Sequence, residues 1–134
     1  MVTKTEYTIQ QVAEITGLSG HTLRYYERIG LLSSVDRAAN GHRRYTDDTI
    51  REIEFLNKLR ATGMPIREMQ HYAKLRRQGQ STLAERQAML KSHHVVVTEQ
   101  LRLLQEYLKV IEYKIALYQQ LQEEQQHEST SVGS

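Results

Sequence analysis

The stretch TIQQVAEITGLSGHTLRYYERIGLL, residues 8–32, decides the fold of the first half of the chain. Its start predicts a short helix over residues 8–14, capped by a threonine and carrying apolar residues at helical spacing. Gly17 ends this helix, because glycine adopts positive φ without strain. Ser19 caps a second helix over residues 20–28. Two short helices joined in this way are typical of a helix-turn-helix, with an ordinary helical hairpin as the alternative.

The second predicted helix carries polar side chains suited to duplex DNA. His21 and Thr22 lie near its N-terminus, where a helix in the major groove needs hydrogen-bonding groups for base edges. Arg24 and Tyr25 follow, and a forked guanidinium and a neutral hydroxyl both suit phosphate oxygens. We expect the neighbouring Tyr26 to pack in the core instead.

The next segment, residues 32–46, predicts a short hairpin of the kind called a wing. Asn40-Gly41 favours a tight turn between two short segments that are able to pair. Alternation places Arg43 and Tyr45 on one face of this hairpin and Arg44 on the other, so that one set is able to face the DNA backbone while the other packs or pairs internally. The alternative is an exposed basic hairpin that is merely solvated.

Two more helices are predicted before a boundary near residue 78. The first runs over residues 47–61, and the second opens at Met64-Pro65-Ile66 and continues to about Arg76. Arg60 lies near the junction between them and offers a further basic contact. Residues 1–78 therefore form the predicted DNA-binding domain.

Residues 8–76 resemble the DNA-binding domain of the MerR family of transcription regulators. The resemblance rests on the stretch quoted above and on the stretches RAANGHRRYT and LRATGMPIREM. It implies that the second helix enters the major groove and that the wing and the later helix pair flank it. It assigns Arg24, Tyr25, Arg43 and Tyr45 to DNA contacts and places Arg60 against phosphate.

The rear half predicts one long dimerisation helix over residues 79–122. Residues 81–122 contain neither glycine nor proline, and apolar side chains follow a heptad pattern from His94 onward. So long a helix needs a partner to cover its apolar side. The MerR resemblance implies an antiparallel coiled coil of two such helices. The expected dimer interface consists of Val97, Leu101, Leu104, Leu108, Ile111, Ile115 and Tyr118.

Composition narrows the possible chemistry. The sequence has no cysteine, which excludes thiolate metal sites, iron–sulfur clusters and cysteine nucleophiles within it. We expect no metal and no cofactor. No apolar run approaches the roughly 20 residues of a membrane span, and the first ten residues do not resemble a secretion signal, so a cytoplasmic protein without membrane contact is predicted. The polar residues 123–134 are expected to form a disordered tail.

A small-molecule effector is compatible with the sequence but is not identified by it. The layout LNKLRATGMPI resembles a MerR subgroup linked to aldehyde or electrophile stress, whose members often have a cysteine where this chain has Lys58. A pocket using Tyr72, Tyr107 and Tyr113 is one hypothesis, and a packing role for these tyrosines is the alternative.

The predicted fold class is mainly α: a winged helix-turn-helix domain followed by a long dimerisation helix. Residues 1–79 carry 13 Lys and Arg against 9 Asp and Glu, as expected for a half that meets a polyanion.

We expect a homodimeric, sequence-specific transcription regulator that binds a pseudo-palindromic promoter and distorts it for RNA polymerase. The alternatives are an architectural DNA-bending protein without an effector and a helical adaptor that binds protein. An enzyme is not expected, because the sequence lacks a glycine-rich phosphate loop and the HExxH and Gly-x-Ser-x-Gly motifs.

Overall fold

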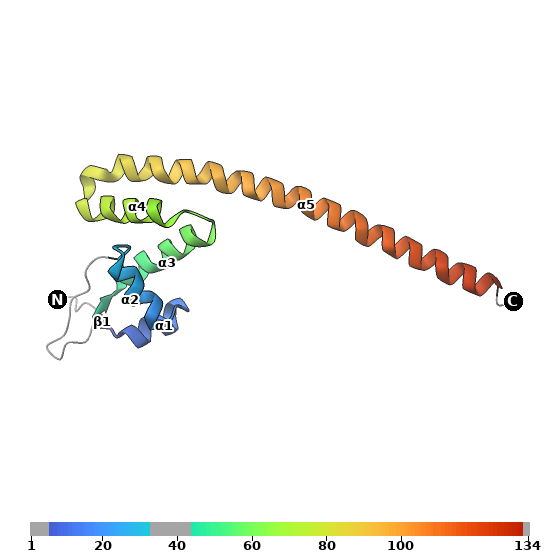
Figure 1. Cartoon of the computed structure of the whole chain (residues 1–134), viewed down its shortest axis with the longest axis horizontal. Helices are drawn as coiled ribbons and strands as arrows, with labels where there is room; N and C mark the ends of the chain where they lie inside the picture. The colour runs from blue at the N-terminus through green and yellow to red at the C-terminus, as the bar shows by residue number, and fades with distance from the viewer. Residues whose placement is uncertain (1–5, 33–43, 133–134) are drawn as a thin grey trace. The chain divides into compact units, whose positions relative to one another are not determined.

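The computed structural model describes residues 6–32 and 44–132, and most of these residues are helical (Figure 1). One compact unit extends to His93 and a second begins at His94. Within the described ranges, no helix is both long enough and apolar enough to cross a membrane. The elements in chain order are β1 (Glu6–Tyr7), α1 (Ile9–Thr16), α2 (Gly20–Arg28), β2 (Tyr45–Thr46), α3 (Asp47–Ala61), α4 (Ile66–Gln78), a 3₁₀ turn (Gln80–Thr82) and α5 (Leu83–Val132).

The helix-turn-helix forms where the sequence predicts it. The Thr8 hydroxyl accepts a hydrogen bond from the Gln11 amide, and the Gln11 side chain accepts one from the Thr8 amide, which together make a capping box. Gly17 has a φ of 76° and ends α1. The Ser19 hydroxyl accepts a hydrogen bond of 3.1 Å from the Thr22 amide and starts α2.

The core of the first unit joins all of its longer helices. Val12 of α1 packs with Leu23 and Tyr26 of α2, and all three are buried. Tyr26 is only 1% exposed, so its expected core position is confirmed. The remaining buried members of this cluster are Leu31, Leu32, Tyr45, Ile50, Ile53, Leu56, Leu59, Met64 and Met69.

A two-stranded antiparallel sheet lies beside these helices. β2 pairs with β1, with Tyr7 opposite Tyr45 and Glu6 opposite Thr46. The sequence gives no indication of β1, because two residues are too short to show an alternating pattern. The turn predicted at Asn40-Gly41 lies outside the described residues.

The connection between α4 and α5 is a turn that is anchored by one buried side chain. The Thr82 side chain is 5% exposed, and its hydroxyl donates a hydrogen bond of 2.6 Å to the Leu75 carbonyl. Leu90 of α5 packs against the core. The boundary predicted near residue 78 coincides with this turn, but the compact unit continues through His93.

The helix α5 continues beyond its expected end at residue 122, as far as Val132. Residues 123–132 are therefore helical in place of the disordered tail that we expected. Gln and Glu are good helix formers, and the pairs Gln119–Glu123 and Gln120–Glu124 form side-chain hydrogen bonds one turn apart, at 3.0 and 3.3 Å. These interactions and the helix propensity of Gln and Glu favour continuation of the helix into this segment.

Candidate nucleic-acid interface

The helix α2 presents a row of polar side chains to solvent. His21, Arg24 and Tyr25 are exposed, whereas Thr22 is half-buried. The Thr22 hydroxyl lies 2.9 Å from the Ser19 hydroxyl, so it shares a hydrogen bond with the residue that caps the helix. The predicted base-reading and phosphate-binding residues of this helix thus lie on one short, capped element.

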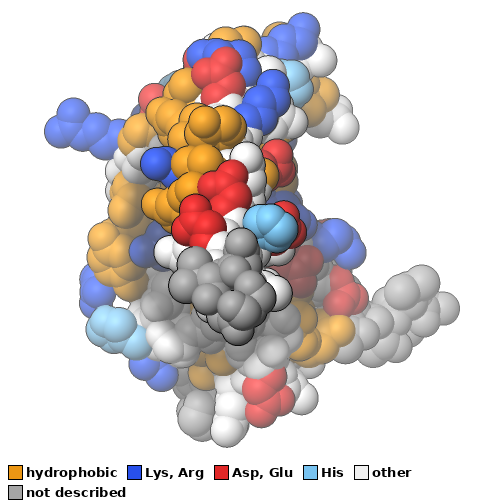
Figure 2. Space-filling view, turned by 90° about the vertical axis from the view of Figure 1, so that its right-hand side faces the viewer, with side chains coloured by type: hydrophobic (Ala, Val, Ile, Leu, Met, Phe, Trp, Pro, Cys, Tyr) orange, Lys and Arg blue, Asp and Glu red, His pale blue; other side chains and the backbone are white. Residues whose placement is uncertain are grey.

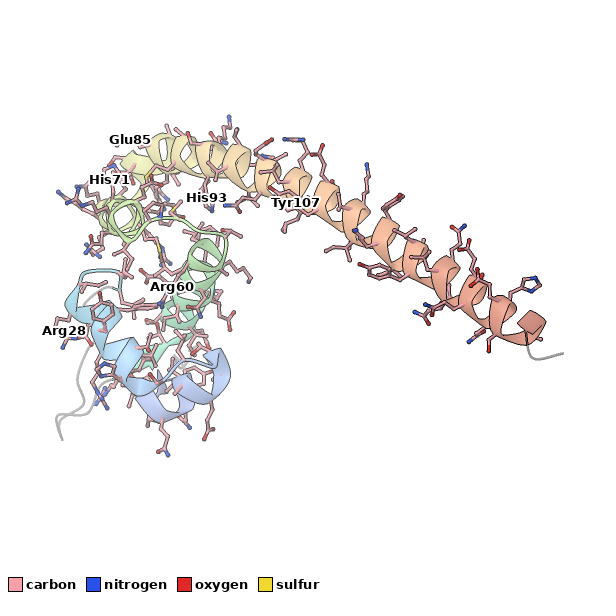
Figure 3. The ribbon with its side chains drawn as sticks, turned by 45° about the vertical axis from the view of Figure 1, so that its right-hand side comes forward. Arg28, Arg60, His71, Glu85, His93 and Tyr107 are labelled. Carbon is pink, nitrogen blue, oxygen red and sulfur yellow. The ribbon has the colours of Figure 1, made fainter. Side chains whose placement is uncertain are left out.

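Tyr25 is held on two sides. The Arg28 guanidinium lies 5.6 Å from the centre of its ring, and the Tyr26 ring lies 6.4 Å away at a tilt of 47°. These contacts restrict the ring, which is 37% exposed, on the solvent side of α2. Arg28, labelled in Figure 3, was absent from the residues predicted for DNA contact, although its guanidinium lies against one of them.

Arg60 connects the end of α3 to α2. Its Nη1 donates a hydrogen bond of 2.6 Å to the Tyr26 hydroxyl, and its guanidinium lies 5.8 Å from the centre of the Tyr26 ring (Figure 3). Arg60 nevertheless remains exposed. Since a guanidinium has five N–H donors, this contact leaves donors for a phosphate.

Two side chains of α4 hold the C-terminal end of α2. Gln70 Nε2 donates a hydrogen bond of 2.8 Å to the Ile29 carbonyl, and Arg77 Nη1 donates one of 2.9 Å to the Gly30 carbonyl. Ile29 is the C-cap of α2 and Gly30 follows it, so both donors bind the backbone immediately after the helix. Neither residue was predicted from the sequence. The two contacts join residues that are 41 and 47 positions apart, and no local sequence pattern indicates contacts over such separations.

Tyr45 is not available to DNA in this structure. Its side chain is 0% exposed and belongs to the core cluster, which corrects its expected role as a backbone contact. The physical reason is its place in β2 opposite Tyr7, with the side chain on the inner face of the sheet. Arg44 beside it is exposed and pairs with Glu6 at 3.5 Å. Arg43 lies outside the described residues.

The tyrosines considered for an effector pocket fall in different units. Tyr72 belongs to the first unit, where its ring centre lies 5.8 Å from that of Phe55. Tyr107 and Tyr113 belong to the second unit and are 57% and 66% exposed. Lys58 is exposed. Among residues 6–32 and 44–132, no three His, Cys, Asp or Glu side chains gather as a group able to hold a metal ion.

Comparison with known proteins decides the family. Residues 7–75 match the family model described as MerR HTH family regulatory protein, and residues 50–113 match the model described as MerR, DNA binding. The chain belongs to the MerR family. The resemblance stated from the sequence and the mainly helical fold expected with it are confirmed, and the chain is a MerR-type transcriptional regulator.

Relatives of this MerR regulator extend over most of its length. An uncharacterised HTH-type transcriptional regulator of Haemophilus influenzae is 36% identical over 113 residues, which cover 84% of each chain. The regulator AdhR of Bacillus subtilis is 40% identical over 82 residues, or 61% of this chain and 59% of AdhR. Both relatives are HTH-type transcriptional regulators.

Solved structures of MerR regulators show the same fold. HiNmlR, a MerR family regulator lacking the sensor domain and solved bound to promoter DNA, superposes with a TM-score of 0.80 at 35% identity, covering 87% of this chain and 92% of HiNmlR. A MerR family regulator from Bacillus thuringiensis gives a TM-score of 0.76 at 30% identity, covering 84% and 98%. The similarity therefore includes the long helix as well as the helix-turn-helix.

Proposed function

We propose that this MerR regulator acts as a homodimer that binds a pseudo-palindromic promoter and distorts it to control RNA polymerase. The observation that carries the proposal is that α2 is held from α3 by Arg60 and from α4 by Gln70 and Arg77, while His21 and Arg24 remain exposed on it. A helix that is packed on its neighbours and carries exposed polar side chains suits the major groove. The solved complex of the similar HiNmlR with promoter DNA supports this assignment.

The roles of the individual residues follow from their chemistry. His21 and Thr22 lie at the N-terminal end of α2, where recognition helices contact base edges. Arg24 and Tyr25 bind phosphates beside the groove, and Arg60 and the wing residue Arg43 extend this contact. The Tyr45 side chain has a packing role in this proposal, because it is buried.

The dimer is formed by α5. The side chains at the predicted a and d positions from Leu101 to Tyr118 are between 52% and 63% exposed in the single chain. Figure 2 shows hydrophobic side chains gathered on the surface that faces the viewer. Aliphatic side chains open to water in such a long row favour association with a second copy. Antiparallel pairing places two copies of α2 so that they read the two half-sites of a symmetric promoter.

Distortion of the promoter is the step that affects transcription. Bending and untwisting DNA costs several kcal/mol, on the order of 1–6 for smooth bending, and contacts on both half-sites supply this energy. The proposed site of action is the cytoplasm, where the promoter and RNA polymerase of bacterial relatives are found.

The deciding experiment is to map the genomic sites that the full-length protein binds and to measure their affinity against random DNA. A preference of about 10³ or more supports a sequence-specific regulator. Comparable affinity for both DNAs would contradict it and favour an architectural protein.

A second measurement tests the phosphate contacts. Arg24→Ala is expected to reduce the slope of log K against log salt concentration by about 0.9 for each phosphate that the variant no longer neutralises. Lys91→Ala, at an exposed position of α5, is the matched control. A slope unchanged by Arg24→Ala would remove Arg24 from the interface.

A further inference from the structure

A hollow of about 270 Å³ lies between α3 and α4. Phe55 and Leu56 of α3 line it together with Tyr72 and Ala73 of α4. The Phe55 and Tyr72 rings are tilted by 49° with their centres 5.8 Å apart, so they form two walls of an apolar corner. Small-molecule sites usually enclose about 300–1,000 Å³, so this hollow suits a compact ligand.

The hollow is lined by more basic than acidic side chains. Glu52 is 9% exposed and accepts a hydrogen bond of 2.8 Å from Arg76 Nη1. Arg51 also lines the hollow, with 68% of its side chain exposed, and it pairs with Asp48 on its own helix. The lining therefore carries two guanidinium groups and one carboxylate. Each guanidinium has one carboxylate partner, Asp48 for Arg51 and Glu52 for Arg76, and each has five N–H donors in all, so donors remain for a ligand.

We propose that this hollow binds a small organic carboxylate with an aromatic or branched apolar body. The apolar body packs against Phe55 and Tyr72, which offer flat apolar surface. The ligand carboxylate accepts hydrogen bonds from Arg51 and Arg76, whose forked donors match carboxylate geometry. A cationic ligand is disfavoured, because the charged groups of the lining that retain further hydrogen-bonding capacity for a ligand are the donors of two guanidinium cations, whereas the Glu52 carboxylate is largely buried and paired with Arg76.

The position of the hollow connects it to DNA binding, and this part of the inference rests on the proposed function. Arg76 is followed directly by Arg77, which donates to the Gly30 carbonyl at the end of α2. Gln70 on the same helix donates to the Ile29 carbonyl. A ligand that competes with Glu52 for Arg76 alters the packing of α4 on α3, and α4 holds the recognition helix. Ligand binding therefore changes the affinity for the promoter.

Binding is tested on the full-length protein without DNA. Benzoate is titrated into isotope-labelled protein and amide shifts are followed by NMR, with benzylamine as the cationic counterpart of similar size. We expect saturable shifts over residues 51–56 and 72–76, with a Kd on the order of 1 mM or tighter, and no saturable response to benzylamine. The absence of saturation with benzoate, or an equal response to both compounds, would overturn the proposal.

Variants locate the site. Phe55→Leu keeps an apolar side chain at a partly exposed position but removes one ring, and Arg51→Ala removes one guanidinium at the rim. Each is expected to weaken benzoate binding about three- to tenfold, whereas Lys74→Ala, exposed on α4, leaves it unchanged. Thermal melts confirm that the variants fold. Arg76 is left intact, because its removal would strand the buried Glu52 carboxylate. Unweakened binding in both variants would place the ligand elsewhere.

The proposed effect of the ligand on DNA binding is tested separately, by measuring promoter affinity. Saturating benzoate is expected to change promoter affinity by about fivefold or more in the wild type and not in Phe55→Leu. Unchanged affinity with benzoate bound would refute the coupling. A protein that binds benzoate but never binds a specific promoter would refute the proposed function while leaving the ligand site intact.

Discussion

The Arg60 guanidinium donates a hydrogen bond of 2.6 Å to the Tyr26 hydroxyl, which joins the end of α3 to the buried side of the recognition helix. Tyr26 is 1% exposed, whereas Arg60 remains exposed. One arginine thus touches both the core and the solvent side of the domain. This geometry makes a structural role and a phosphate contact compatible in the same side chain, and the two roles are separable by mutation.

Tyr26→Phe removes only the hydroxyl that accepts from Arg60, and so tests the structural role of Arg60 apart from its phosphate contact. We expect the free energy of unfolding to fall by about 0.5–1.5 kcal/mol, because one hydrogen bond is removed, with no change in the salt dependence of DNA binding. Arg60→Ala is expected to lower stability by a similar amount and also to lower the salt slope by about 0.9. Urea denaturation and binding titrations at several salt concentrations measure both quantities. An unchanged slope in Arg60→Ala would leave Arg60 with the structural role alone.

The contacts from α4 to the end of α2 predict a loss of specificity. Gln70→Ala and Arg77→Ala each remove one hydrogen bond to a carbonyl at the end of α2. Because α2 then moves more freely, each variant is expected to lower promoter affinity about three- to tenfold while binding to random DNA and its salt slope stay the same. Gln78→Ala, also exposed on α4, is the control. Equal losses on promoter and random DNA would show that these side chains contact phosphate directly.

The apolar side of α5 predicts the oligomeric state. Leu108 and Ile111 are 52% and 54% exposed in the single chain and occupy adjacent core positions of the predicted coiled coil. Leu108→Asp or Ile111→Asp would bury an uncompensated charge in the dimer, so we expect dissociation to monomers. Lys109→Asp introduces the same side chain outside the predicted seam and is expected to leave the dimer intact. Sedimentation equilibrium distinguishes the two states, and a stable dimer in both core variants would disprove this interface.

Glu52 predicts an unusual dependence of stability on pH. Burial raises the pKa of its carboxyl above the ordinary value of 4.5, although Arg76 opposes the rise. The folded chain therefore binds this proton more tightly than the unfolded chain. Glu52 favours folding below pH 4.5, and this contribution is lost as the pH rises through the raised folded value.

Glu52→Gln removes this titration. The stability of the variant relative to the wild type is expected to be more favourable at pH 7 than at about pH 4, where the wild-type carboxyl is increasingly protonated. Urea denaturation at both pH values provides the comparison, with Glu68→Gln on the exposed side of α4 as the control. The opposite trend would mean that pairing with Arg76 outweighs burial.

Local sequence was sufficient to predict the elements of the DNA-binding half. The caps at Thr8 and Ser19 and the break at Gly17 gave the positions of α1 and α2, because caps and positive φ depend on neighbours within a few residues. The heptad pattern likewise predicted a long helix. Its extension to Val132 was missed, because a polar composition was interpreted as disorder when Gln and Glu also favour helix.

The roles of several side chains depend on contacts between segments far apart in sequence. Tyr45 was expected to contact DNA but lies in the core. Its strand, β2, pairs with β1, which lies near the start of the chain and far from Tyr45 in sequence. Gln70 and Arg77 were not expected to contribute, yet they hold the end of α2. The burial of Glu52 beside Arg76 also had no sequence signature.

Local spacing and residue types at nearby positions were enough to predict the main helices, the helix-turn-helix and the family. Which side chains face solvent, and which contact the end of the recognition helix, became clear only from the folded chain. The physical reason is that burial and hydrogen-bond partners depend on how α3 and α4 pack against α2, and that packing joins residues more than thirty positions apart.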